Sequence, residues 1–193
     1  MNLIVNEIFY SLQGEGGRTG QASIFIRLAK CNLDCRFCDT DFESGRDMTV
    51  DEILDEIRGF GCKWLVWTGG EPTLLLNDEI VAFFKQKGYQ QAIETNGTRR
   101  IPIGIDYIAC SPKQNFEKVR ALIPYADELR FPMQKGSPLP DAAILPEAAH
   151  YFLSPIFNEN RAIPENIDYC VELVKNNPPW ALSLQIHKLI GIR

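Results

Sequence analysis

The sequence lacks any long apolar run, since no stretch approaches the roughly 20 apolar residues that a membrane-spanning helix needs. Residues 1–7 also lack the cationic start and the apolar segment of a secretory signal peptide. These two absences argue against an exported or membrane-inserted protein. We therefore expect a cytoplasmic protein that does not act at a membrane.

An excess of positive charge is missing as well. The 193 residues include 20 Lys and Arg against 25 Asp and Glu, which gives a formal net charge of −5. A surface that follows nucleic-acid phosphates needs clustered cations, so we expect no nucleic-acid partner and favour a small-molecule substrate. The chain also has no internal repeat, low-complexity tract or Pro/Gly/Ser-rich linker. This pattern predicts a single domain over residues 1–193.

Histidine is scarce, with two residues, whereas three of the six cysteines are concentrated in one place. Cys31, Cys35 and Cys38 have the spacing C-x3-C-x2-C. Three thiolates can hold a four-iron cluster and leave one iron open, whereas structural zinc takes four protein ligands and an electron-transfer ferredoxin uses a fourth cysteine. A zinc-binding interaction module remains an alternative if a distant residue completes the ligand set. The residues available for this are Cys62, Cys110, Cys170, His150 and His187, although we expect the three cysteines among them to be core thiols.

Hydrophobic periodicity predicts helices that alternate with short strands. Thr49 and Glu52 have the pattern of a capping box, which begins a helix that ends before Gly59. Further helices are predicted over residues 77–87 and 164–175, with a weaker candidate over residues 115–122. The β-rich runs are residues 7–11, 23–28, 63–67, 91–95, 107–110, 128–131, 151–153 and 182–186.

Strands that alternate with helices indicate an α/β fold with a parallel sheet. The chain is short for a closed eightfold barrel, so we predict an incomplete βα barrel of the TIM type. Four polar motifs follow or end predicted strands, where parallel barrels build their active sites. These motifs are the cysteine run 31–38, Thr68-Gly69-Gly70-Glu71-Pro72, Glu94-Thr95-Asn96 and Ser111-Pro112-Lys113.

The three-cysteine spacing, with the aromatic Phe37 directly before the third cysteine, resembles the radical S-adenosylmethionine (SAM) superfamily. The resemblance implies an incomplete barrel of the radical SAM type, with the cluster loop over residues 29–48. It also implies that SAM chelates the open iron of a [4Fe-4S] cluster and is cleaved to a 5′-deoxyadenosyl radical that attacks a substrate C–H bond. A barrel interior with little water suits such a reactive species.

The same resemblance implies a set of SAM contacts. Glycine lets the backbone approach a ligand closely, and hydroxyls and a cation suit a ribose and a carboxylate. Taken singly, each of these residues is more often a turn or a strand-end cap. The implied contacts are Phe37, Cys38, Asp39, Gly70, Glu71, Thr95, Asn96, Ser111, Pro112 and Lys113.

Further residues are similar to the 7-carboxy-7-deazaguanine synthase family over nearly the whole chain. They are the segment Ser11-Leu12-Gln13-Gly14-Glu15-Gly16, then Arg27, Cys38-Asp39-Thr40, and His187 six residues before Arg193. The resemblance implies a lyase that converts 6-carboxy-5,6,7,8-tetrahydropterin to 7-carboxy-7-deazaguanine with loss of ammonia, on the route to queuosine and other 7-deazapurines. The implied substrate contacts are Leu12, Gln13, Gly14, Glu15, Arg27, Thr68, His187 and Arg193, the last through the terminal carboxylate.

The chemistry of these residues fits such roles. Arg27 presents a planar fork suited to a carboxylate, although an ion pair with a glutamate is the structural alternative. Gln13 and Glu15 can match the donor and acceptor edge of a pterin. His187 is expected in a terminal loop directly after the strand at residues 182–186. Thr40 resembles the magnesium ligand of the family, and a loop cap is its structural alternative.

The resemblance further implies Mg²⁺, a homodimer, and an external low-potential electron donor such as flavodoxin or ferredoxin. Two positions depart from the family pattern, since Ser154 stands where relatives often carry Gln and Phe37 stands where Trp is common. A glycyl-radical activating enzyme shares the cysteine spacing and is the alternative among enzymes. It has no evident use for Gln13, Arg27 or the tail that begins at His187.

Overall fold

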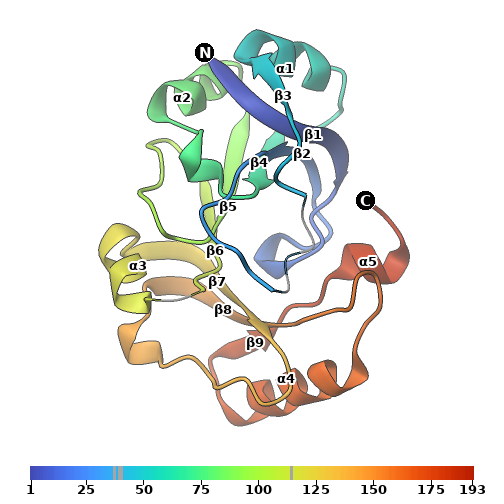
Figure 1. Ribbon diagram of the computed structural model, residues 1–193, viewed down its shortest axis with the longest axis vertical. Helices are drawn as coiled ribbons and strands as arrows, with labels where there is room; N and C mark the ends of the chain where they lie inside the picture. Colours follow the sequence, from blue (N-terminus) through green and yellow to red (C-terminus); the bar gives the residue numbers. More distant parts are fainter. Residues whose placement is uncertain (37, 39–40, 114) are drawn as a thin grey trace. The chain divides into compact units, whose positions relative to one another are not determined.

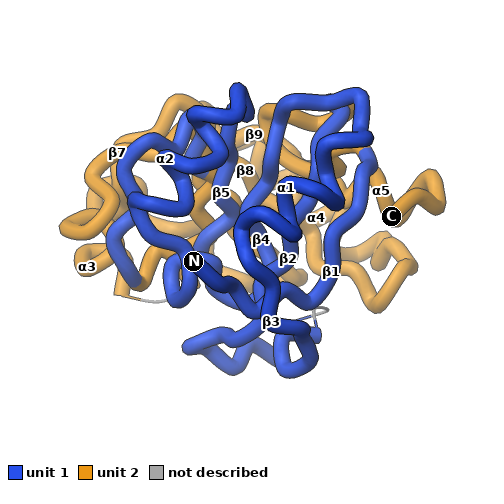
Figure 2. Tube along the Cα trace, turned by 90° about the horizontal axis from the view of Figure 1, so that it is seen from above, with its two compact units in different colours: residues 1–11, 22–95, 99–108 blue, residues 12–21, 96–98, 109–193 orange. Residues whose placement is uncertain are grey.

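The computed structural model describes residues 1–36, 38, 41–113 and 115–193. Strands and helices alternate along the chain, as the sequence predicts (Figure 1). The chain divides into two compact units, each built from three stretches of sequence (Figure 2). The first unit is Met1–Ser11, Ala22–Thr95 and Arg99–Ile108, and the second is Leu12–Gln21, Asn96–Thr98 and Ala109–Arg193. The single domain over residues 1–193 stays a prediction.

The sheet of the first unit has the strand order β3-β1-β2-β4-β5. Its strands are β1 (Asn2–Leu12), β2 (Ala22–Leu28), β3 (Arg46–Thr49), β4 (Trp64–Gly69) and β5 (Gln90–Thr95). The pairs β2–β4 and β4–β5 are parallel, whereas β1 and β3 are antiparallel. Four consecutive residues of β4 are buried, as expected for a central strand that is covered on both faces.

Two helices cover this core, α1 (Val50–Ile57) and α2 (Asp78–Gln86). The predicted capping box is confirmed, because Thr49 accepts from the Glu52 amide while the Glu52 side chain accepts from Thr49. The apolar face of α1 places Ile53 and Ile57 in the same buried cluster as Trp67 of β4. The helical spacing of the apolar residues therefore determines both the helix and the face that it buries.

The second unit carries the strands β6, β7, β8 and β9 in that order, and every pair is parallel. They are β6 (Tyr107–Cys110), which begins in the last residues of the first unit, β7 (Tyr125–Met133), β8 (Glu147–Pro155) and β9 (Trp180–Leu182). The helices are α3 (Phe116–Leu122), α4 (Pro164–Asn176) and α5 (Ile186–Ile190). In the described part of the chain, no helix is both long and apolar enough to cross a membrane.

Two elements differ from the prediction. The strand expected over residues 182–186 is wrong, because β9 ends at Leu182 and Ile186 begins helix α5. The amide of Ile186 donates to the Gly14 carbonyl at 3.0 Å, so at this point the chain bonds to a loop. His187 consequently lies in a helix. Strand β3 was not predicted, because it is short and its first two residues are exposed and charged.

The cap of α1 makes a measurable contribution to stability. Thr49→Ala is expected to lower the free energy of unfolding by about 1 kcal/mol, because it removes the acceptor for the Glu52 amide. Thr49→Ser keeps that acceptor and is the matched control. Anaerobic urea unfolding followed by circular dichroism checks this, and equal midpoints for the two variants would contradict it.

Candidate active site

The three cysteines of the C-x3-C-x2-C motif lie in the loop that follows β2. None of the three is in a disulfide; Cys31 and Cys35 are partly exposed and Cys38 is exposed. The amide of Cys38 donates to the Cys35 carbonyl at 2.9 Å, which closes a turn between these two residues. Over the described residues, no three His, Cys, Asp or Glu side chains are grouped to hold a metal ion. The support for a cluster is therefore the spacing and the soft thiol donors, which suit iron.

The two ends of this loop are tied to each other and to β1. The Lys30 amide donates to the Phe42 carbonyl at 2.6 Å, and the Asn6 side chain donates to the Ser44 hydroxyl at 2.8 Å. A hydrogen bond from the Ser44 hydroxyl, with help from nearby amides, lowers the pKa of Asp41. These contacts fix where the cluster loop begins and ends.

The loop after β4 contacts the base of the cluster loop through its backbone. The Gly70 amide donates to the Leu28 carbonyl at 3.1 Å, and the Glu71 amide donates to the Lys30 carbonyl at 2.9 Å. A Cβ at Gly70 would overlap the Lys30 carbonyl oxygen and press on the Cβ of Cys31. Glycine at this position therefore permits the two loops to touch.

Glu71, which the sequence predicts as a SAM contact, is fully buried. Its Oε1 accepts from the amide and the hydroxyl of Thr73, at 3.1 and 2.7 Å, and from the hydroxyl of Thr95 at 2.8 Å. This carboxylate therefore joins the loop after β4 to the end of β5. Two predicted SAM contacts, Glu71 and Thr95, are brought together.

Polar side chains also meet across β2, β4 and β5. Arg27 is the register partner of Thr68, and the Thr68 hydroxyl donates to Glu94 Oε2 at 2.8 Å. Arg27 Nε lies 2.8 Å from Glu7 Oε1, and each side chain is 23% exposed. The structure thus contains the ion pair that was the structural alternative for Arg27. Its predicted contact with a substrate carboxylate stays a prediction.

The remaining SAM candidates belong to the second unit. Asn96 is buried, and its Oδ1 accepts from the amide and hydroxyl of Thr98. Ser111 follows β6 and donates to the Arg130 carbonyl at 2.7 Å, while Lys113 Nζ donates to Ser111 Oγ at 2.5 Å. Pro112, between them, is buried.

The segment expected to read the substrate edge is also in the second unit. Leu12 is exposed, whereas Gln13 is buried and its Oε1 accepts from the Glu15 amide at 3.1 Å. A Cβ at Gly14 would overlap His187 Nδ1, so Gly14 and His187 lie directly side by side. Arg193 is exposed at the end of the chain.

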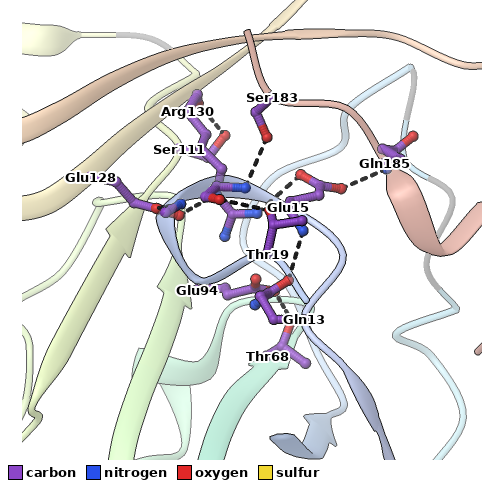
Figure 3. Close-up of polar contacts among 12 residues, drawn as sticks. Gln13, Glu15, Thr19, Thr68, Glu94, Ser111, Glu128, Arg130, Ser183 and Gln185 are labelled. Atoms are coloured by element: carbon purple, nitrogen blue, oxygen red, sulfur yellow. Dashed lines mark hydrogen bonds and ion pairs between the residues drawn. The ribbon is translucent and has the colours of Figure 1, made fainter. Parts of the chain in front are cut away.

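Glu15 is held by two residues that the sequence prediction missed (Figure 3). Arg130 Nη1 lies 3.0 Å from Glu15 Oε2, and Gln185 Nε2 donates to Glu15 Oε1 at 2.8 Å. A signal for Arg130 was present, since Glu128 and Arg130 share one face of a strand whose neighbours are apolar. Gln185 carries no comparable signal.

Three predicted residues, Phe37, Asp39 and Thr40, lie outside the described residues. The cysteines beyond the motif are core thiols, as predicted. Cys110 and Cys170 are buried, and Cys62 packs partly buried against the core. Burial raises the pKa of Cys170 to about 11.

Comparison with known proteins adds independent findings. The chain matches the Radical SAM superfamily over residues 25–139. It is 44% identical over 189 residues to a 7-carboxy-7-deazaguanine synthase of Bacteroides thetaiotaomicron, which covers 98% of each protein. It is also 44% identical over 201 residues to the Haemophilus influenzae protein of the same name, with 99% of this chain and 94% of that protein covered.

A solved structure supports the fold. The crystal structure of QueE from Escherichia coli matches with a TM-score of 0.74 at 24% identity, covering 97% of this chain and 95% of that one. The predicted α/β fold of the radical SAM type, with a mostly parallel sheet, is confirmed by this match and by the superfamily match.

The contact at Gly70 can be tested directly. Gly70→Ala is expected to lower the iron retained after anaerobic reconstitution, because its methyl group would push the base of the cluster loop away. Gly59→Ala is the matched control, since a Cβ there meets no atom within 4 Å. Iron and sulfide per chain are measured for both. Wild-type iron content in Gly70→Ala would contradict the proposed contact.

Proposed function

Because the chain belongs to the 7-carboxy-7-deazaguanine synthase family of the radical SAM superfamily, we propose that it is a radical SAM lyase. It converts 6-carboxy-5,6,7,8-tetrahydropterin to 7-carboxy-7-deazaguanine with loss of ammonia, in the biosynthesis of queuosine and other 7-deazapurines. The observation that carries this proposal is 44% identity to a named synthase over 98% of both chains.

The cluster and SAM have matching donors in the first unit. Cys31, Cys35 and Cys38 are thiols of one loop, none of them in a disulfide, and would hold the cluster. When bound, the cluster and SAM supply the one-electron chemistry that activates a substrate C–H bond. The amides of Gly70 and Glu71 hold the loop after β4 against the base of the cluster loop, and the buried Glu71 carboxylate ties that same loop to Thr95.

Substrate contacts are assigned separately in each unit. In the first, the ion pair to Glu7 orients the plane of the Arg27 guanidinium, which is the group suited to a substrate carboxylate. In the second, Gln13, Glu15 and His187 surround Gly14 with donors and acceptors that match a pterin edge. Leu12, Thr68 and Arg193 complete the proposed set.

Further parts of the proposal rest on the family resemblance. Thr40 would ligate a Mg²⁺ ion that also binds substrate oxygens. The enzyme would act as a homodimer and take electrons from a flavodoxin or ferredoxin. The six cysteines, none of them in a disulfide, fit a reducing compartment, which supports the cytoplasm as its location.

An anaerobic assay tests the reaction. Reconstituted protein with SAM, a low-potential reductant and the carboxylated tetrahydropterin is expected to form 7-carboxy-7-deazaguanine, detected by mass spectrometry. Cys35→Ala should lose both the cluster and turnover, because each thiolate holds a separate iron. Cys62→Ala should retain both, since Cys62 packs against the core. Absence of product from the fully loaded wild-type protein would refute the proposed function.

The role of Arg27 separates substrate binding from the chemistry of SAM. Arg27→Ala is expected to raise the KM for the pterin by about tenfold to 150-fold, the value of a charge-assisted hydrogen bond. Reductive cleavage of SAM should persist. Steady-state kinetics with both readouts checks this, and an unchanged KM would leave Arg27 as the structural partner of Glu7 alone.

A further inference from the structure

Both oxygens of the Glu15 carboxylate are bound by residues that are distant in the sequence (Figure 3). Arg130, on β7, lies 3.0 Å from Oε2, and Gln185, just before α5, donates to Oε1 at 2.8 Å. The Arg130 side chain is 9% exposed and that of Glu15 is 19% exposed. Contacts this sheltered from water hold a carboxylate more firmly than a surface ion pair does.

Arg130 divides its guanidinium between two carboxylates. Its Nε lies 2.9 Å from Glu128 Oε1, while Nη1 lies on Glu15. Glu128 in turn accepts from the Gly17 amide at 2.7 Å. The Nη1 group donates a hydrogen bond to Glu15, whereas the Nε contact with Glu128 is an ion pair without hydrogen-bond geometry. The directed bond of Arg130 is therefore the one to Glu15.

The main chain around Glu15 is anchored by other contacts. The Gly16 amide donates to Ser183 Oγ at 2.9 Å, and the Ile186 amide donates to the Gly14 carbonyl at 3.0 Å. These bonds, together with that from Gly17 to Glu128, fix the backbone without using the Glu15 side chain. The contacts of Arg130 and Gln185 with Glu15 therefore set the direction of its carboxylate. The backbone of the loop is already fixed by the other bonds.

We propose that Arg130 and Gln185 are positioning residues that orient the Glu15 carboxylate for the pyrimidine edge of the pterin. This inference rests on the proposed function, in which Glu15 contacts the substrate. The edge presents an amino group and a ring N–H side by side, and two such donors need a carboxylate held in their plane. A carboxylate that is oriented before binding spares the cost of ordering it when the substrate arrives.

Double-mutant cycles test the proposal on the reconstituted holoenzyme. The variants are Arg130→Gln, Glu15→Ala and their combination, with the KM for the carboxylated tetrahydropterin as the readout. Arg130→Gln is expected to raise the KM by about tenfold in the wild-type background. In the Glu15→Ala background it should change the KM by less than about twofold, because residues that act through one another are not additive.

A second cycle protects the test against a folding defect. Gln185→Met removes the donor to Glu15 Oε1 at a partly buried position and keeps the length of the side chain. It should raise the KM several-fold, roughly as a neutral hydrogen bond predicts, and only while Glu15 is present. If Arg130→Gln has lost iron or melts early, this cycle decides.

The control and the opposing outcomes are distinct. Arg120→Gln removes a guanidinium that donates to the Ala143 carbonyl at the surface, and it should leave the KM unchanged. Equal KM increases with and without Glu15 would show a merely structural role and overturn the proposal, while leaving the proposed function intact. Failure of the wild-type holoenzyme to turn over the pterin would overturn both.

Discussion

The close backbone approach between the loop after β4 and the base of the cluster loop organises the first unit. Leu28 and Gly69 are register partners in parallel neighbouring strands, so both loops leave the sheet at one level. Gly70 then lets the second loop bond to the carbonyl groups that precede Cys31. The buried Glu71 carboxylate, in the same loop, accepts a hydrogen bond from the Thr95 hydroxyl and so connects this loop to the end of β5. The first residues of the cluster loop are therefore held in a fixed position.

A different constraint organises the second unit, where charge is buried on a strand. As whole residues, Glu128 and Arg130 are 2% and 7% exposed to solvent. Charged groups that are buried to this extent are stable only when they are paired and hydrogen-bonded. The two side chains pair with each other, the Gly17 amide donates to Glu128, and Glu15 pairs with Arg130. The bond from the Gly17 amide to Glu128 thus serves both the burial of charge on β7 and the placement of the proposed substrate loop.

Much of this architecture could be predicted from the sequence, because local signals and tertiary structure agree. The capping box at Thr49 and the apolar strands β4 and β6 follow directly from pattern. Helix α5 could not be predicted, since its start is set by the bond between Ile186 and the distant Gly14. The ion pair of Arg27 with Glu7, and the hold of Arg130 on Glu15, likewise join residues whose proximity only the folded sheet creates. Sequence motifs thus indicate candidate ligand contacts, whereas the residues that hold these candidates in place are found only in the folded structure.

The most direct test of the proposed reaction follows one hydrogen atom. Turnover of 6-carboxy-5,6,7,8-tetrahydropterin that carries deuterium at C6 is measured anaerobically, and the adenosyl compounds are recovered for mass spectrometry. If this chain activates that C–H bond, deuterium will appear in the 5′-deoxyadenosyl group of SAM or of 5′-deoxyadenosine. Product formation with unlabelled adenosyl compounds would contradict the proposed reaction.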